Sequence, residues 1–192
     1  NKKRVYNASN MSSKTVPTEK KTFWQGVREW IRVIVIALII AIPVRFFIAE
    51  PFIVNGASMD PTFSTGQFLI VDRLTYRFEQ PKRGDVIVFE FPYNPSVYYI
   101  KRIIGLPGER VRMQNGRIFI EQASTSQKFA LEEPYIQSYH LSRDNIVLPD
   151  TDKPLEPGQY IVLGDNRRES SDSRVWGLLD SKFIIGRPII RL

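Results

Sequence analysis

The chain has 192 residues, 43% of them hydrophobic, which allows one domain of moderate size with a real core plus an appendage. It contains no cysteine, which excludes disulfides, thiolate metal sites and cysteine nucleophiles. Of the net charge of +7, a share of +5 lies in residues 1–30, where seven Lys and Arg face two Glu, and the remainder of the chain carries only +2. A nucleic-acid-binding protein would cluster cations on its folded part, so this pattern disfavours nucleic acid as a partner.

The basic N-terminal residues precede the apolar segment "WQGVREWIRVIVIALIIAIPVRFFIAEPF". Its unbroken apolar run, residues 33–44, has 12 residues, a length more typical of a core helix or a signal-peptide h-region. However, Arg32 and Arg45 can snorkel from its ends, and "PVRFFIAEPF" lacks the small residues of a cleavage site. We therefore expect a cytoplasmic tail (1–26), an uncleaved transmembrane helix (27–48) and an extracytoplasmic domain (49–192) at the plasma membrane.

After residue 60, short β-branched and aromatic runs alternate with turn residues, and no long helical period occurs. Strands are predicted in "QFLIVDRLTY", "DVIVFEF", "VYYIKRIIGL", "GQYIVLGDN" and "KFIIGRPIIRL", the last with Pro188 at an edge or bulge. "ERVRMQNGRIFIEQ" predicts a hairpin with a type I′ turn at Asn115 and Gly116. The polar, proline-bearing region of about 122–157 indicates a long connection or a small insertion. The expected fold is mainly β, an antiparallel and partly closed, barrel-like sheet.

The stretch "GASMDPTF" (56–63) places Ser58 among small residues just beyond the expected membrane helix. The serine either caps a turn or serves as a nucleophile, and a nucleophile needs a base beside it. His140 is the single histidine and lies in a loop-rich region, where a solvated side chain is the simpler interpretation. One histidine also excludes an H-E-x-x-H metalloprotease. No pair of carboxylates is marked by the sequence.

A lysine can act as the base when burial lowers its pKa. Lys101 lies in the apolar run "VYYIKRIIGL", unlike most lysines of the chain. If this run is a strand, Tyr99, Lys101 and Ile103 share one face, while Arg102 lies on the other. The alternation does not decide which of the two cations is more buried. The competing interpretation is that this run is an edge strand and that the ammonium of Lys101 reaches water.

The segment "GDNRRESSDSRVWG" (164–177) crowds polar side chains between a predicted strand and a turn. It is either a solvated loop with local Asx turns or a scaffold that orients an active site.

Four motifs together resemble the type I signal peptidases, membrane-bound serine proteases that remove signal peptides from exported proteins. They are "SMDPTF" (58–63), "RGDVIVF" (83–89), "YYIKRIIGLPGE" (98–109) and "GDNRRESSDSRVWG" (164–177), in the family's order and after one N-terminal anchor. The size and single anchor resemble the short bacterial form.

The resemblance implies a Ser-Lys dyad, with Ser58 as nucleophile and Lys101 as general base, and no metal or cofactor. The backbone N–H of Ser58 would contribute to the oxyanion hole, because Gly56 replaces a serine that some members use for this purpose. The implied supporting residues are Ser170, which would orient the lysine, the ion pair Asp172 and Arg174, and the scaffold positions Asp165 and Ser173. The implied substrate pockets, which accept small residues at −1 and −3, are lined by Phe52, Val54, Tyr99 and Ile100.

The implied partners are membrane lipid and the preproteins that bear signal peptides. The resemblance also implies that the protein lies near the protein export channel. Two alternatives remain at this stage. One is a self-cleaving Ser-Lys repressor, although such proteins are soluble and carry a DNA-binding domain. The other is an inactive or specialised membrane-anchored relative that acts as a binding or scaffold protein. The presence of both Ser58 and Lys101 argues against this second alternative.

Overall fold

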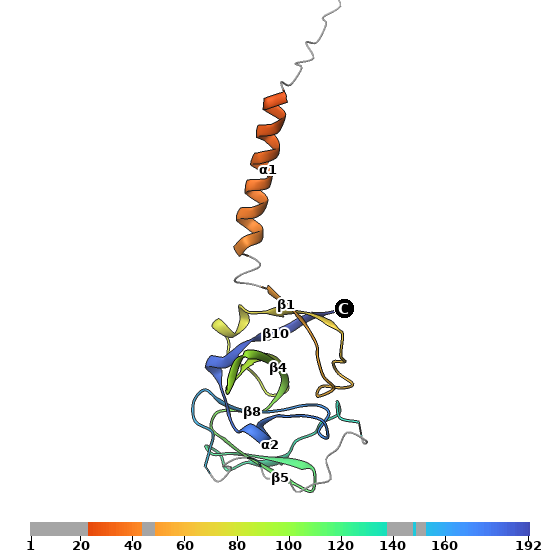
Figure 1. Cartoon of the computed structure of the whole chain (residues 1–192). Coiled ribbons are helices and arrows are strands. Elements are labelled where there is room, and N and C mark those ends of the chain that lie inside the picture. Colours follow the sequence, from red (N-terminus) through yellow and green to blue (C-terminus); the bar gives the residue numbers. More distant parts are fainter. Residues whose placement is uncertain (1–22, 44–48, 138–147, 149–152) are drawn as a thin grey trace, which may run out of the picture. The chain divides into compact units, whose positions relative to one another are not determined.

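The computed structural model describes residues 23–43, 49–137, 148 and 153–192. The chain divides into two compact units, Asn1–Ala41 and Ile42–Leu192, which are described separately (Figure 1). His140 lies outside the described residues.

The first unit contains all but the last two residues of helix α1 (Phe23–Pro43), whose 21 residues begin four residues earlier than the predicted span 27–48. Its isoleucines are exposed on all sides of the helix, as the values for Ile34, Ile36, Ile39 and Ile40, 51–65%, illustrate. Among the described residues, no helix combines the length and the apolar character needed to cross a membrane. The predicted transmembrane helix is therefore not confirmed, and residues 44–48 lie outside the described part.

The second unit is built from two antiparallel sheets (Figure 1). The larger has the strand order β1-β2-β10-β3-β4-β8-β9. Its strands are β1 (Ala49–Ile53), β2 (Phe68–Asp72), β3 (Val86–Phe91), β4 (Asn94–Gly105), β8 (Gln159–Leu163), β9 (Leu179–Asp180) and β10 (Ile184–Arg191). The smaller consists of β5 (Glu109–Gln114), β6 (Arg117–Gln122) and β7 (Lys128–Ala130). Short helical turns are η2 (Thr75–Arg77), α2 (Ser173–Trp176) and η4 (Ser181–Phe183). The mainly β, antiparallel fold class is confirmed.

The local predictions hold where the sequence pattern was strong. Each predicted strand overlaps an observed one, although β4 begins three residues before its predicted run, and β5 and β6 form the predicted hairpin. Its turn residues Asn115 and Gly116 have φ angles of 50° and 74°, as a type I′ turn requires. The register of β10 against β2 shifts after Pro188, which marks the predicted bulge. Strand β1 was not predicted because Pro51 interrupts its pattern, which an edge strand tolerates.

Strands β4 and β8 separate two hydrophobic cores. One face of β4 contributes Ile103 to a core that includes Phe89 of β3 and Val162 of β8. The opposite face contributes Ile104 to a core shared with the β5–β6 hairpin, including Ile120. Side chains of successive residues point to opposite faces of a strand, so both faces of β4 are dry at this end. A polar side chain here is therefore desolvated whichever way it points.

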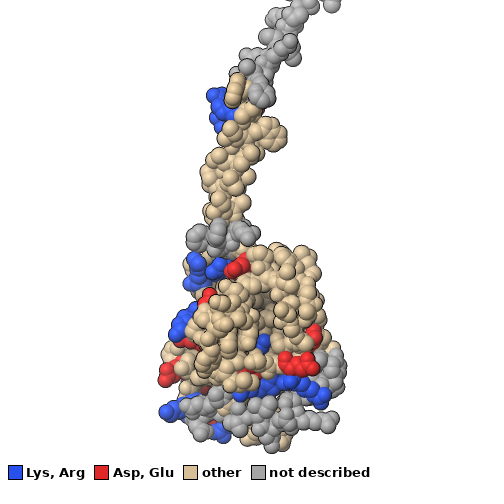
Figure 2. All heavy atoms as spheres, in the orientation of Figure 1, with Lys and Arg blue, Asp and Glu red and all other residues tan. Residues whose placement is uncertain are grey.

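Charged side chains of both signs lie on the face of the second unit shown in Figure 2. Surface ion pairs include Arg73–Glu50 at 3.0 Å and Arg110–Glu121 at 3.2 Å. This mixture agrees with the near-balance of charge beyond residue 30, and such exposed pairs add little to stability.

We predict that Ile103→Ala lowers the free energy of unfolding by about 3 kcal/mol, because it leaves a cavity in a fully buried part of the core. The exposed Ile189→Ala on β10 is the matched control, with an expected change below about 0.5 kcal/mol. Urea unfolding of the full chain in detergent, followed by tryptophan fluorescence, measures both. Equal losses in the two variants would contradict this packing.

Candidate active site

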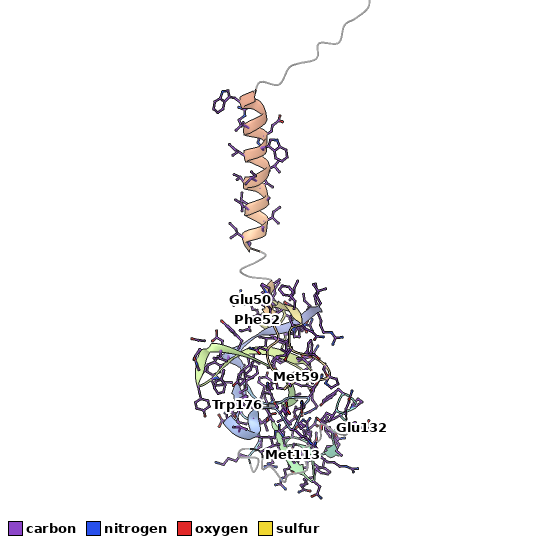
Figure 3. All side chains as sticks on the ribbon, turned by 45° about the vertical axis from the view of Figure 1, so that its right-hand side comes forward. Glu50, Phe52, Met59, Met113, Glu132 and Trp176 are labelled. Atoms are coloured by element: carbon purple, nitrogen blue, oxygen red, sulfur yellow. The ribbon has the colours of Figure 1, made fainter. Side chains whose placement is uncertain are left out.

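Ser58 lies in the turn that follows β1, and its neighbour fixes this turn. The side chain of Met59 is fully buried inside the unit (Figure 3). The N–H of Phe63 donates to the carbonyl of Met59 at 2.9 Å, which closes the turn. The N–H of Asn166 donates to the carbonyl of Ser58 at 3.1 Å, which ties the turn to the segment after β8. The Ser58 hydroxyl is thereby held at a fixed position while its side chain stays partly accessible.

Lys101 reaches Ser58 from the middle of β4. Its Nζ donates to Ser58 Oγ at 2.8 Å and to the carbonyl of Ile100 at 2.8 Å. The residue is 3% exposed, and its Nζ lies 5.1 Å from the centre of the Tyr99 ring. Lys101 points to the face of Ile103, and Arg102 points to the other face, as strand alternation predicts. Lys101 is the more buried of the two cations, which settles the question that the sequence left open.

Burial lowers the pKa of Lys101 to about 8, because the apolar surroundings disfavour the ammonium form. The carboxylates of Asp172 and Asp165 act in the opposite direction, and the guanidinium of Arg174 lowers the pKa further. Desolvation is the largest of these effects. A neutral amine is therefore accessible near physiological pH, within hydrogen-bond reach of a serine hydroxyl.

Asp165 joins three segments of the site, but through Arg102 and not through the lysine. Its carboxylate accepts hydrogen bonds from Arg102 Nε at 2.8 Å and Nη2 at 2.6 Å, a bidentate pair. Thr62, in the turn that carries Ser58, donates to the same carboxylate at 2.5 Å. The guanidinium of Arg102 also lies 3.9 Å from the centre of the Tyr135 ring. Sequence reasoning assigned no role to Thr62, although it belongs to the motif "SMDPTF", or to Tyr135, which lies outside the four motifs.

Asp172 and Arg174 form an ion pair that supports the segment after β8. Arg174 donates to the Asp172 carboxylate through Nε at 2.7 Å and Nη2 at 2.8 Å. Asp172 also accepts the N–H of Gly164 at 3.0 Å, and the Ser173 hydroxyl accepts the N–H of Val162 at 2.9 Å. Asp172 and Ser173 are fully buried, so these contacts are shielded from water. They hold the loop in one conformation beside Lys101.

The Ser170 hydroxyl lies close to these buried groups but forms no hydrogen bond with them. It is buried and has no hydrogen-bond partner among the described residues. The structure therefore does not form the hydrogen bond to Lys101 that the resemblance implies. Gly164 explains how closely the segments pack: a Cβ at this position would lie 2.2 Å from Ser170 Oγ and 2.4 Å from the Ser58 carbonyl oxygen. The buried Ser170 hydroxyl therefore has an unused hydrogen-bond donor near the turn that carries Ser58.

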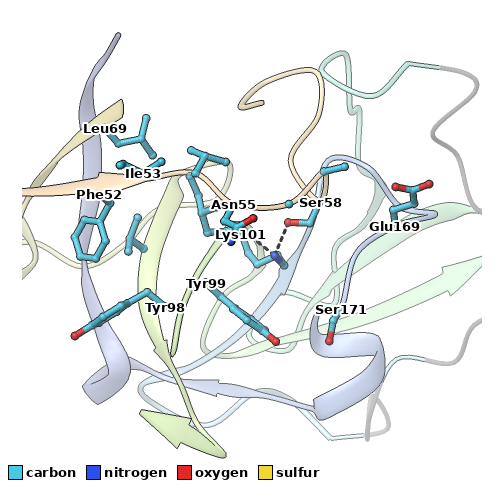
Figure 4. A pocket seen from close by; sticks show the side chains of 15 residues that line it. Phe52, Ile53, Asn55, Ser58, Leu69, Tyr98, Tyr99, Lys101, Glu169 and Ser171 are labelled. Atoms are coloured by element: carbon cyan, nitrogen blue, oxygen red, sulfur yellow. Dashed lines mark hydrogen bonds between the residues drawn. The ribbon is translucent and has the colours of Figure 1, made fainter. Parts of the chain in front are cut away.

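A cavity of about 280 Å³ opens beside Ser58 and Lys101 (Figure 4). All four residues expected in the substrate pockets line it, namely Phe52, Val54, Tyr99 and Ile100. Sequence reasoning missed Leu69, Val88, Tyr98, Glu169 and Ser171, which also line it. From the sequence, Leu69 and Val88 are expected only to be core residues of their strands. Glu169 and Ser171 are expected only to be loop residues. Within the described ranges, no group of three or more His, Asp or Glu side chains is arranged to hold a metal ion.

Comparison with known proteins places these features in a family. Residues 27–192 match the family model described as signal peptidase, peptidase S26. The probable signal peptidase I-1 of Synechocystis sp. is 37% identical over 175 residues, which cover 88% of this chain and 83% of the relative. The signal peptidase I of Bacillus licheniformis is 35% identical, over 82% of this chain and 84% of its own. A crystal structure of a signal peptidase I from Enterococcus faecalis V583 aligns with 57% of this chain and 97% of its own, at 33% identity and a TM-score of 0.46.

The family model covers all described strands, the serine turn and the lysine strand. The relatives match over most of both chains, so the similarity is not confined to one motif. This chain belongs to the signal peptidase family, peptidase S26.

Proposed function

We propose that this protein cuts signal peptides from exported preproteins with Ser58 as nucleophile and Lys101 as general base. As a member of the signal peptidase family it is a serine endopeptidase that acts on preproteins bearing signal peptides. The observation that carries the residue assignment is the 2.8 Å contact between Lys101 Nζ and Ser58 Oγ at the cavity. A scaffold protein without turnover would need neither a desolvated lysine nor a serine in its reach.

The chemistry follows from the neutral amine. Lys101 Nζ accepts the Ser58 proton while Oγ attacks the carbonyl carbon of the scissile peptide bond. The resulting ammonium returns this proton to the leaving nitrogen, so the mature protein departs as an amine and the signal peptide stays bound as an ester. Lys101 then takes a proton from water, whose oxygen attacks the ester, and Ser58 recovers its proton as the signal peptide leaves as a carboxylic acid.

The surroundings of Ser58 suit a tetrahedral intermediate and an extended substrate. The backbone N–H of Ser58 is the proposed oxyanion donor. Gly56 has a φ of 105° and open space at its Cα, so a substrate backbone can approach closely. The substrate would add as a strand beside the segment from Phe52 to Gly56. The cavity walls formed by Phe52, Val54, Tyr99 and Ile100 would accept small residues, chiefly alanine, at −1 and −3.

The scaffold residues have separate proposed tasks. Asp165 fixes Arg102 and Thr62, which sets the distance between β4 and the nucleophile turn. Asp172 and Arg174 hold the loop that carries Ser170. The buried Ser170 hydroxyl is the proposed donor or acceptor for Lys101 once substrate adjusts the site.

We further propose that residues 27–48, which include all but the first four residues of α1, are a membrane anchor, with the tail 1–26 cytoplasmic and residues 49–192 extracytoplasmic. The exposed isoleucines of α1 support this, because an apolar surface on all sides of a helix needs a non-aqueous cover. The basic residues that precede it favour the cytoplasmic side. Membrane lipid and the vicinity of the export channel are the partners that such an anchor implies.

Cleavage of a preprotein with an Ala-x-Ala site by the full chain in detergent tests the residue assignment. Ser58→Ala and Lys101→Arg should each lower kcat/KM by about 10³-fold or more, because the first removes the nucleophile and the second replaces the base with a group that does not deprotonate. Ser96→Ala and Lys128→Arg, at exposed positions on β4 and β7, should cleave as the unchanged protein does. An active Lys101→Arg variant would refute the proposed base.

The pH dependence of kcat/KM tests the state of the lysine. Because the lowered pKa makes the free base the minority form below about 8, the rate should rise about tenfold per pH unit on the acid side and level off above pH 8. The profile is measured with a substrate that has no titrating group near the cut. A rate that continues to rise toward the pKa of an ordinary lysine would show that Lys101 is not desolvated.

Gly164→Ala tests the close packing behind Ser58. The added methyl would meet the Ser58 carbonyl oxygen at 2.4 Å, so the nucleophile turn must shift, and kcat/KM should fall by about 10²-fold. The matched control is Gly105→Ala, whose methyl would meet Val111 at 2.6 Å in the core. That variant should lose stability while its folded molecules keep their activity. Wild-type activity of Gly164→Ala would contradict the packing described here.

A further inference from the structure

The cavity at Ser58 has two chemically different ends. In Figure 4, the rings of Phe52 and Tyr98 lie on one side of Ser58, and the side chain of Glu169 lies on the other. The ring centres of Phe52 and Tyr98 are 5.2 Å apart, which makes the first end an aromatic wall. The second end carries the carboxylate of Glu169 and the hydroxyl of Ser171.

Glu169 is free to act on a ligand from this position. Its side chain is exposed, and its carboxylate takes part in no ion pair within the part of the chain that the structure describes. Its backbone is held by the segment itself, because the Glu169 N–H donates to the Asn166 carbonyl at 3.3 Å. Asn166 in turn donates its own N–H to the carbonyl of Ser58, so the backbone that carries Glu169 is tied to the turn that carries Ser58.

The direction of the substrate follows from the two ends, and this step rests on the proposed function. A peptide cut after small apolar residues places those residues against the aromatic wall formed by Phe52 and Tyr98. The residues after the cut then pass over Ser58 toward Glu169. In an extended chain side chains alternate, so the residue at +2 points to the same face as the residue at −1. Because Glu169 lines the same cavity as the residues expected to hold the −1 side chain, the +2 side chain is the one directed toward its carboxylate.

We propose that Glu169 is a specificity-determining residue that favours a basic and disfavours an acidic side chain at position +2 of the substrate. Position +2 is the second residue of the mature protein, so this selection acts on the exported product and leaves the requirements at −1 and −3 of the signal peptide unchanged. Exposed charge pairs are weak and screened by salt, so the expected preference is modest, about 5-fold between lysine and glutamate at low ionic strength.

The test compares three peptides that differ only at +2, with lysine, glutamine or glutamate after the same Ala-x-Ala site. For each enzyme the ratio of kcat/KM for the lysine and glutamate peptides is measured, so that any change in overall rate cancels. The full chain in neutral detergent should favour lysine about 5-fold, Glu169→Gln should bring the ratio near 1, and Glu169→Lys should invert it. Raising the salt to about 0.5 M should bring the ratio of the unchanged protein toward 1.

Glu156→Lys is the matched control, because Glu156 is exposed and does not line the cavity. It makes the same charge change and should keep the ratio of the unchanged protein. A ratio in Glu169→Lys equal to that of the unchanged protein would overturn the proposal, as would an equal shift in Glu156→Lys. The glutamine peptide separates the two hypotheses: failure of the unchanged protein to cut it contradicts the proposed function, whereas cutting without a +2 preference contradicts the role of Glu169 alone.

Discussion

The burial of Lys101 beside Ser58 is the constraint on which the rest of the site depends. A pKa of about 8 means that the ammonium form of Lys101 is less stable in the folded chain than in the unfolded chain. Below pH 8 this difference destabilises the fold by about 3 kcal/mol, and it disappears as the pH rises from the folded pKa to the unfolded one. Few proteins of this size can lose that much stability without compensation. The proposed chemistry accounts for a buried lysine that stability alone does not favour.

The surrounding contacts supply that compensation and fix the geometry. Both faces of β4 are covered by hydrophobic cores, which gives the strand a rigid setting. Asp165 connects Arg102 of β4 with Thr62 of the turn that carries Ser58, and the Asn166 N–H donates to the Ser58 carbonyl. These bonds come from segments far apart in sequence, so the distance between Ser58 and Lys101 is set by the whole sheet. The carboxylates nearest the lysine are each paired with an arginine, which limits how far they raise its pKa.

Much of this arrangement was predictable from the sequence, because it follows from local backbone preferences. The parts that depend on long-range packing were not predictable in this way. Alternating β-branched runs and the Asn115–Gly116 turn indicate strands and a hairpin, since each follows from local backbone preference. Alternation also places Lys101 and Arg102 on opposite faces, but which face is drier depends on the strands packed against them. The Asp165–Thr62 hydrogen bond and the lack of a partner for the Ser170 hydroxyl depend on segments far apart in sequence, so no local pattern predicts them. Glu169 resembled any loop carboxylate until the fold brought it to the cavity.

The central claim is that the fold desolvates Lys101 and so makes its neutral amine accessible near physiological pH. The most direct test is a pH titration of the Lys101 side chain by NMR, with ¹³C-labelled lysine in the full chain and Lys101→Met to assign its signal. The account predicts a midpoint near pH 8 for this residue in the folded protein, and a midpoint near 10.4 after unfolding. A folded-state midpoint near 10.4 would contradict the account, because the lysine would then be an ammonium that cannot accept the serine proton.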